Sequence, residues 1–317
     1  MSQPPAESIA SRLRRAIHLY LFGDEDNITL IQSTPLLFMH VMALGVFFVP
    51  FSWAAVAACA ATYAIRVFAL TAGYHRYFSH NSFKTSRVFQ FILAFLGGTA
   101  AQLGPLWWAA HHRYHHQHAD TENDIHSPIT KGVFRAHMGW IMCKKYAKTE
   151  LDRIPDFAKY PELRFLDRFH SIPPMVLAGS LFAIGEWLAA ARPAWGTTGW
   201  QFVFWGFFLS SVFVYHATFC INSLTHMVGK RRFNTSDHSR NSFILALITF
   251  GEGWHNNHHR YPVAARQGLY WWEIDITYYI LKVLSWLGIV WDLRGHPAKL
   301  YEEAATVPVR PLADRAR

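Results

Sequence analysis

Cysteine is scarce in this chain and shows no pattern. The 317 residues include only Cys59, Cys143 and Cys220, which lie far apart and form no C-x-x-C pair. This spacing excludes a disulfide framework and a structural zinc site built on thiolates. A metal site in this chain would have to use other ligands.

Charge is scarce as well. Charged residues make up 16% of the chain, whereas 51% of the residues are apolar and 16% are aromatic. The mean hydropathy of +0.07 is too high for an average soluble domain and too low for a bundle that lies wholly in lipid. We therefore expect a membrane protein with a large water-facing part. The net charge of +9 fits an anionic membrane surface or an acidic partner, whereas nucleic-acid binders rarely carry long apolar runs.

Four long apolar runs predict four membrane-spanning helices, because a span needs about 20 apolar residues. The first two, at about 34–50 and 51–72, are joined by an uncharged tight turn. The last two, at about 173–191 and 200–221, are joined by a connection that carries one charge. We predict an all-α integral membrane fold in which two transmembrane hairpins carry a helical cap.

Two further apolar segments fit the membrane surface better than its interior. Residues 88–110 are broken by glycine and proline, and a fifth span there would separate His75 from His112 across the membrane. We expect a buried helix that abuts the membrane. Residues 270–290 contain Glu, Asp and Lys and predict an interfacial amphipathic helix.

The distribution of basic residues predicts the orientation. Residues 73–170 contain thirteen Lys and Arg, and Lys/Arg-rich loops stay cytosolic. Both termini and the cap are therefore expected in the cytosol. The expected organisation is a tail with an amphipathic helix (1–28), one membrane domain (29–296, with its cap at 73–170 and 222–296) and a polar C-terminal tail (297–317). The N-terminus lacks a signal-peptide core, and we find no lipidation motif.

Histidine is the one residue in excess, with 19 copies. Two H-x-x-H-H boxes stand out, at 112–116 and 255–259. On a helix, residues i and i+4 share one face, so His112 and His116 can hold one ion while His115 turns toward a second. The same spacing pairs His255 with His259 and turns His258 aside. Two such boxes facing each other predict two neighbouring metal sites.

Two more pairs lie at the ends of predicted spans. His75 and His80 are five residues apart, which rotates them by roughly 140° on an ideal α-helix. They can share an ion only if the helix ends between them, and we expect that end at Tyr77–Ser79. Asn222 and His226 again have the i, i+4 spacing. Five of the remaining histidines are expected at the surface or as hydrogen-bonded core residues (His18, His40, His170, His238, His296). The other five are candidates for positions beside a ligand (His111, His118, His126, His137, His216).

An all-imidazole ligand set suits zinc, iron, copper or nickel. Nine histidines are too many for one structural ion and about right for two. Two ions beside an apolar membrane face suggest redox chemistry on a lipid. Iron with O2 fits such chemistry, because acid–base catalysis cannot break an unactivated methylene C–H bond and a metal–oxygen oxidant can.

Together the residues 71–80, 112–116, 222–226 and 251–259 resemble the membrane-bound fatty acyl desaturases, most closely the Δ9, stearoyl-CoA desaturase-like branch. The resemblance implies four transmembrane helices, a cytosolic catalytic cap, two iron ions and O2-dependent insertion of a cis double bond. It implies that one ion is held by His75, His80, His112, His116 and His258. The other would be held by His115, His226, His255, His259 and, through water, Asn222.

The resemblance also suggests substrate contacts. Gln102, Trp108 and Thr218 match groups that line the bend of the acyl chain, and Lys144 with Lys145 match a basic pair that can meet CoA phosphates. Where the animal acyl-CoA enzymes have Arg-Asp before the central box, this chain has Ala-His at 110–111. Acyl-CoA is the first expectation for the substrate, with acyl-lipid or acyl-carrier protein left open.

Electrons would have to come from outside the chain, because the sequence shows no flavin or haem motif. A basic cap would attract an acidic carrier of the ferredoxin or cytochrome b5 type. Two alternatives remain at this point. A related di-iron lipid hydroxylase or alkane monooxygenase would share the ligands. A membrane metal-binding or transport protein would need ionisable residues along its spans, where His40, Arg66 and His216 are the only obvious candidates.

Overall fold

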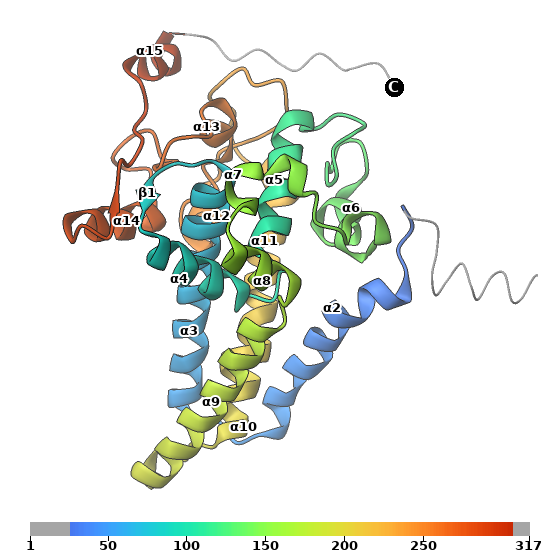
Figure 1. Ribbon diagram of the computed structural model, residues 1–317, viewed down its shortest axis with the longest axis vertical. Helices are drawn as coiled ribbons and strands as arrows, with labels where there is room; N and C mark the ends of the chain where they lie inside the picture. The colour runs from blue at the N-terminus through green and yellow to red at the C-terminus, as the bar shows by residue number, and fades with distance from the viewer. Residues whose placement is uncertain (1–25, 307–317) are drawn as a thin grey trace, which may run out of the picture.

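The computed structural model describes residues 26–306 of the chain, which form a helical bundle topped by a cap (Figure 1). The amphipathic helix predicted at 11–22 lies outside the described residues. Four helices are long and apolar enough to cross a membrane, which confirms that part of the predicted fold. They are Leu30–Phe48 (α2 Leu30–Ala43 and η1 Leu44–Phe48), Trp53–Ser79 (α3 Trp53–Phe68 and η2 Ala69–Ser79), α9 Ile172–Ala191, and Gly199–His226 (α10 Gly199–Gln201, η7 Phe202–Leu209, α11 Ser210–Asn222 and η8 Leu224–His226).

The fourth span is the centre of the bundle. Its most apolar stretch is 61% buried, against 11% for α9, and η7 packs against α2, α3 and α9. At the end of the bundle far from the cap, large aromatic side chains are exposed, among them Phe47, Phe48, Trp53 and Trp187. Aromatic side chains gather at membrane interfaces, so this end fits one face of the bilayer.

Two of the spans are longer than a bilayer requires. Trp53–Ser79 has 27 residues and Gly199–His226 has 28. At 1.5 Å per residue each is about 40 Å long, whereas the hydrocarbon core is about 30 Å thick. Their last turns therefore rise into the cap and carry His75 and His226 with them.

The cap is built from short helices and one pair of strands. The helices are α4 Arg87–Gly98, α5 Pro105–His118, α6 Val133–His137, η3 Gly139–Met142, η4 Lys144–Tyr146, η5 Leu151–Arg153, α7 Pro155–Ala158, α8 Pro161–Arg168, α12 Phe243–Ile248, α13 His255–Arg260, α14 Ile276–Trp286 and α15 Ala298–Thr306. The strands β1 Lys84–Thr85 and β2 Val290–Trp291 pair antiparallel, and η6 Pro193–Trp195 lies in the turn between the last two spans. Both ends of the described chain lie on the cap side of the spans (Figure 1).

The segment 88–110 forms two helices and no fifth span. α4 has 12 residues, too few to cross a bilayer, and α5 begins at Pro105, where proline fits the first turn of a helix. α4 and α14 lie across the direction of the spans (Figure 1). Both expose apolar side chains, such as Val88 on α4 and Trp286 on α14, as expected for helices at a membrane surface.

Part of the segment predicted as a polar tail is helical. α15 is amphipathic, and its Leu300 is buried against Phe233 and Leu269 of the cap. Glu303 on the same helix pairs with Arg260, the residue that follows the second histidine box. Together with the ring contact between Tyr301 and Tyr270, these contacts hold α15 on the cap.

Candidate metal centre

Nine histidines converge in the cap as two groups. Within each group the candidate ligand atoms all lie within 4.8 Å of one another. The first group contains His75, His80, His112, His116 and His258; the second contains His115, His226, His255 and His259. The structure thus brings together the nine histidines that the sequence singled out, in the grouping that it suggested.

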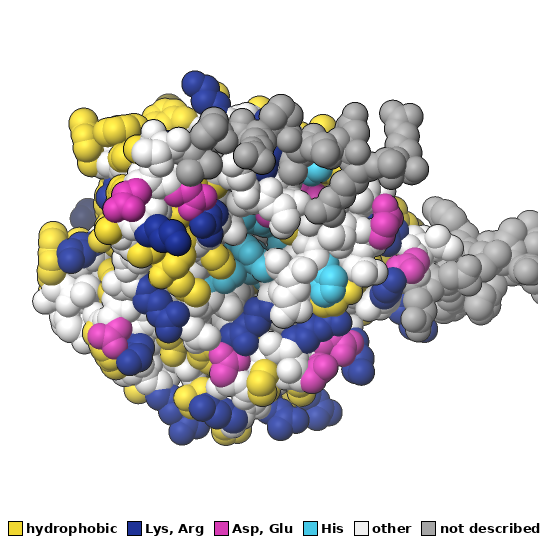
Figure 2. All heavy atoms as spheres, turned by 90° about the horizontal axis from the view of Figure 1, so that it is seen from above, with side chains coloured by type: hydrophobic (Ala, Val, Ile, Leu, Met, Phe, Trp, Pro, Cys, Tyr) yellow, Lys and Arg dark blue, Asp and Glu magenta, His cyan; other side chains and the backbone are white. Residues whose placement is uncertain are grey.

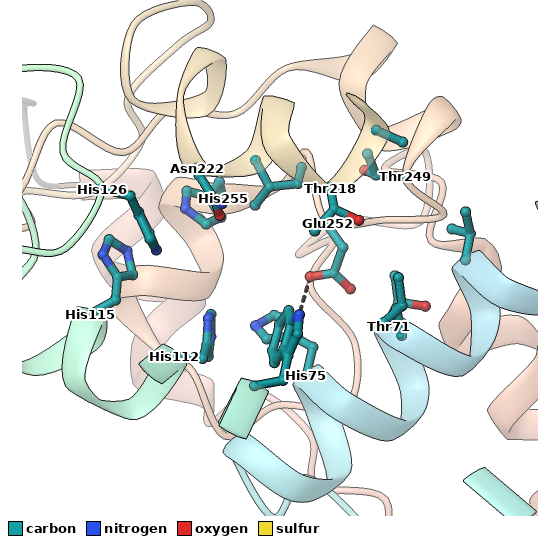
Figure 3. Close-up of a pocket in the computed structure, with 15 residues that line it drawn as sticks. Thr71, His75, His112, His115, His126, Thr218, Asn222, Thr249, Glu252 and His255 are labelled. Atoms are coloured by element: carbon teal, nitrogen blue, oxygen red, sulfur yellow. Dashed lines mark ion pairs between the residues drawn. The ribbon is translucent and has the colours of Figure 1, made fainter. Parts of the chain in front are cut away.

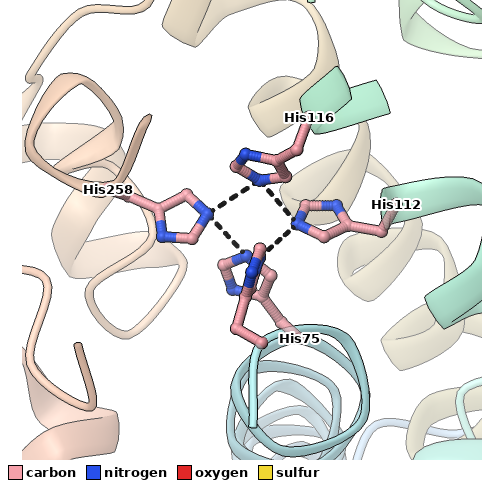
Figure 4. A group of neighbouring side chains, drawn as sticks. His75, His112, His116 and His258 are labelled. Atoms are coloured by element: carbon pink, nitrogen blue, oxygen red, sulfur yellow. Dashed lines mark hydrogen bonds between the residues drawn. The ribbon is translucent and has the colours of Figure 1, made fainter. Parts of the chain in front are cut away.

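In the first group the ring nitrogens point at a common centre (Figure 4). The Nε2 atom of His258 lies 3.0 Å from that of His75 and 3.0 Å from that of His116. The Nε2 atom of His112 lies 2.9 Å from those of His116 and His80. Ring nitrogens gathered at such distances are what one cation would satisfy.

Each helix presents its histidines for a local reason. α5 carries His112 and His116 one turn apart on one face, while His115 points to the second group, as the spacing predicted. The helix ends between His75 and His80, at Ser79, as expected, and His80 is its C-cap. The expectation did not include that η2 is π-wound up to this end. A π-helix bonds residues five apart, so His75 and His80 meet on one side of it.

The second group takes one histidine from α5, one from the end of the fourth span and two from α13. The Nε2 atoms of His226 and His255 are 3.1 Å apart. His259 has a buried Nε2 atom without any hydrogen-bond partner. A buried polar atom without a partner is costly, so this nitrogen is better suited to a metal ion than to an empty site.

Four carboxylates hold the histidine rings from behind, and the sequence analysis did not identify them. Asp124, Asp120 and Asp237 accept from Nδ1 of His115, His226 and His259 at 2.9, 2.8 and 2.8 Å. Glu252 does the same for His75. Metal-binding histidines commonly donate their second ring N–H to a carboxylate, which leaves the Nε2 lone pair free for the ion.

The charge states agree with this arrangement. Burial lowers the pKa values of His112, His116 and His258 well below the ordinary value, and their histidine neighbours lower them further. Burial alone would raise the pKa values of Asp124 and Asp237, but contact with His115 and His259 lowers them instead. Neutral imidazoles backed by ionised carboxylates are the forms that bind a metal ion.

A cavity lies between the two groups and the spans; we call it the central cavity (Figure 3). His75, His112, His115 and His255 line one side of it, and Asn222 lies beside His255. The other side is largely apolar and includes Val67, Leu70, Ala217 and Ile221. An apolar chain lying in this cavity would pass between the two candidate metal sites.

A second cavity joins the first; we call it the side cavity. The two share Trp108, His112, His126, Thr218 and Asn222. At their junction, Gln102 Nε2 donates to Thr218 Oγ1 at 3.0 Å, and Trp108 Nε1 lies 3.4 Å from Gln102 Oε1. The three side chains predicted to line the bend of an acyl chain are therefore one hydrogen-bonded unit at the junction.

The predicted basic pair lies elsewhere. Lys144 and Lys145 belong to η4, and neither lines the two cavities. Lys145 donates to Asp26 at 2.9 Å. Their neighbours Tyr146 and Ala147 do line the side cavity, so the pair lies close to its rim.

The other histidines have varied roles. The Nδ1 atoms of His111 and His118 donate to backbone carbonyls of their own helix, at Trp107 and Tyr114. His126 packs against His115 with ring centroids 4.3 Å apart, and its Nδ1 atom is buried without a partner. His238, expected at the surface or as a hydrogen-bonded core residue, is half-buried, and its backbone N–H donates to Asp120 at 2.7 Å.

Comparison with known proteins agrees with the geometry. The fatty acid desaturase profile matches residues 51–285, which include all nine histidines. An sn-1 stearoyl-lipid 9-desaturase of Anabaena variabilis is 36% identical over 260 residues, 81% of this chain and 90% of that protein. An acyl-CoA C20 Delta5-desaturase of Anemone leveillei is 37% identical over 262 residues, 81% and 78% of the two chains.

A more extended relative is the chloroplastic palmitoyl-monogalactosyldiacylglycerol delta-7 desaturase of Arabidopsis thaliana, which is 36% identical over 260 residues. The match covers 81% of this chain and 66% of that protein. Profile, relatives, spans and histidine groups lead to one conclusion: the chain belongs to the fatty acid desaturase family.

Proposed function

We propose that this protein inserts a cis double bond into a saturated fatty acyl chain, with Δ9-type positioning, at a di-iron centre that uses O2. The central cavity is the observation that carries this proposal. It lies directly against histidines of both groups, and much of the rest of its lining is apolar. A metal carrier or transporter has no need for an apolar channel beside its ions.

The residues fit two metal ions. One iron would be held by His75, His80, His112, His116 and His258, and the other by His115, His226, His255 and His259 with Asn222 acting through water. When bound, the irons with O2 would supply the oxidising power that removes two hydrogens from neighbouring methylene groups. The balance requires two electrons and two protons, and O2 leaves as two water molecules.

The chain's own residues set where that chemistry occurs. Asp120, Asp124, Asp237 and Glu252 fix the imidazole rings, and the apolar wall of the central cavity keeps the acyl chain in register and excludes water. The Gln102–Thr218 hydrogen bond, with Trp108 beside it, would force the chain to bend at the junction of the cavities. The distance from this bend to the carbonyl end would decide which carbons meet the metal ions.

Electrons would come from a separate acidic carrier of the ferredoxin or cytochrome b5 type. Figure 2 shows the cap face, where Lys and Arg side chains surround a hollow in which histidine is visible. A basic rim around a redox centre favours rapid encounter with an acidic protein. The Lys/Arg-rich cap would lie in the cytosol with both termini.

Product analysis tests the proposal. Cells that express the chain with iron and a compatible electron donor should accumulate monounsaturated fatty acids, identified by mass spectrometry, with the double bond mainly at carbon 9. A His112→Ala variant that is still found in the membrane should form none. Hydroxylated fatty acids without new unsaturation would instead support the related hydroxylase reaction.

A further inference from the structure

The side cavity has one wall made by a membrane span. Gln32, Pro35 and Leu36 of α2 line it, opposite Tyr215 and Phe219 of α11. The adjacent α2 residues Ile31, Leu37 and Phe38 are 50%, 46% and 53% exposed and face away from the bundle. One helix thus separates the cavity from the surface that contacts lipid.

α2 is held weakly by polar contacts. Within residues 26–306, the hydrogen bond from His40 to His216 of α11 is the only one that joins a side chain of Leu30–Ala43 to another helix. Pro35 lies inside α2 at the level of the cavity, and proline removes one backbone hydrogen bond and favours bending. The helix therefore has a natural hinge where it covers the cavity and one polar attachment beyond it.

That attachment is one end of a chain of three histidines. His40 Nε2 lies 3.2 Å from His216 Nε2, and His216 Nδ1 lies 3.0 Å from His137 Nε2 on α6. The chain has one consistent order when all rings are neutral. His40 Nδ1 must donate to the Leu36 carbonyl at 2.7 Å, so His216 donates to His40 and His137 donates to His216. His137 Nδ1 then faces the Ser223 hydroxyl at 3.0 Å, which also lies 2.8 Å from the Phe219 carbonyl.

The cavity lining also bears on the head group of the substrate. Within the described part of the chain, no Lys or Arg lines the side cavity. Near its rim, Lys145 donates to the Asp26 carboxylate at 2.9 Å, and Arg135 donates to the Asp26 backbone carbonyl at 2.7 Å. A CoA group carries several phosphate charges and would need free cations here. A neutral or zwitterionic lipid head at the membrane surface would not.

We propose that the side cavity opens sideways between α2 and α11, and that the substrate is an acyl chain esterified to a membrane glycerolipid. The His40–His216–His137 chain is the latch that holds α2 closed. This inference rests on the proposed desaturase function. It replaces acyl-CoA, the first expectation from the sequence, with a lipid that never leaves the bilayer.

The substrate form is tested with the iron-loaded full-length protein in nanodiscs, supplied with a reducing system. Deuterated stearate is offered either in the sn-1 position of an equal mixture of phosphatidylcholine, phosphatidylglycerol and monogalactosyldiacylglycerol, or as stearoyl-CoA. Deuterated oleate in the lipid pool is expected. If stearoyl-CoA gives product and the lipid does not, lipid entry is overturned while the desaturase function stands. If neither substrate gives product, both proposals are overturned.

The latch is tested without reference to activity. In a background with Cys59, Cys143 and Cys220 replaced by alanine, Leu36→Cys is labelled by a lipid-soluble maleimide in nanodiscs. Adding His40→Phe should speed this labelling by roughly tenfold, the change that loss of about 1.4 kcal/mol of hydrogen bonding gives in an opening equilibrium. Leu37→Cys, one residue away and exposed, is the matched control and should be labelled equally in both backgrounds.

Faster labelling at both positions would indicate general loosening of the fold and would overturn the latch, as would an unchanged rate at position 36. A His137→Phe variant, which breaks the other end of the chain, should repeat the His40→Phe result. Leu36→Trp should slow desaturation of the lipid substrate, whereas Leu37→Trp should not; equal rates would contradict passage beside α2.

Discussion

His115 Nδ1 lies 2.9 Å from Asp124 Oδ1, and both side chains are almost completely buried. Asp124 also accepts hydrogen bonds from the backbone N–H groups of Asp120 and His126. These two bonds fix its carboxylate independently of the imidazole. Although burial lowers the pKa of His115, Asp124 outweighs this and raises it. The carboxylate therefore fixes both the orientation of the ring and the nitrogen that carries its proton.

Asp124→Asn should weaken metal binding at the second group by about 10–100-fold, the usual effect of losing a carboxylate behind a metal-binding histidine. The amide keeps the shape of the side chain but not its charge. Iron per chain is measured after dialysis against graded chelator. Glu162→Gln is the control, because Glu162 pairs with Arg87 away from the histidines. Equal iron retention in Asp124→Asn and the control would contradict this role.

His116→Ala should remove iron from the first group and abolish product while the protein stays in the membrane. Its Nε2 atom contacts those of His112 and His258, so its loss leaves a gap in the ring of ligands. His118→Ala is the matched control two residues along, because the Nδ1 atom of His118 contacts only a backbone carbonyl of its own helix. Iron analysis and fatty-acid profiles are read together. Desaturation by His116→Ala would contradict the ligand assignment.

Thr218→Val should relax the position of the double bond. Valine has nearly the same shape as threonine but cannot accept the hydrogen bond from Gln102, so Gln102 is free to move and the bend loses its fixed point. We expect a mixture of double-bond positions in place of one dominant isomer, measured by mass spectrometry of derivatised fatty acids. Thr34→Val, which removes an exposed hydroxyl that bonds within α2, should leave the product unchanged. A single unchanged isomer from Thr218→Val would show that the bend is set elsewhere.

Much of the site could be predicted from the sequence because its spacing is local. The pairing of His112 with His116, and the turn of His115 to a second ion, follow from helix geometry alone. The meeting of His75 with His80 could not, because π winding depends on how η2 packs against α4 and α5. Tertiary packing sets this winding, and the i, i+5 spacing alone does not predict it.

The carboxylates were predictable only in part. Asp120 and Asp124 follow the central box within a few residues, and a search for acidic groups near each box would have found them. Asp237 lies 22 residues before its partner His259 and gives no such signal. Glu252 stands in a Gly-Glu-Gly context whose meaning is visible only in three dimensions: Gly251 has a φ of +123°, and a Cβ there would lie 2.4 Å from Asp275 Oδ1.

Arg76 binds both Glu252 and Asp275, and we expect its replacement to lower the stability of the protein. Its guanidinium lies 3.2 Å from Glu252 and 3.0 Å from Asp275, and all three side chains are buried. Arg76→Met would leave two buried carboxylates without their cation, which costs about 3–5 kcal/mol. Arg87→Met, which removes an exposed partner of Glu162, should cost far less, because water screens an exposed ion pair. Thermal unfolding in detergent, followed by size-exclusion chromatography, should therefore show a much lower midpoint for Arg76→Met than for Arg87→Met, and equal midpoints would contradict the buried network.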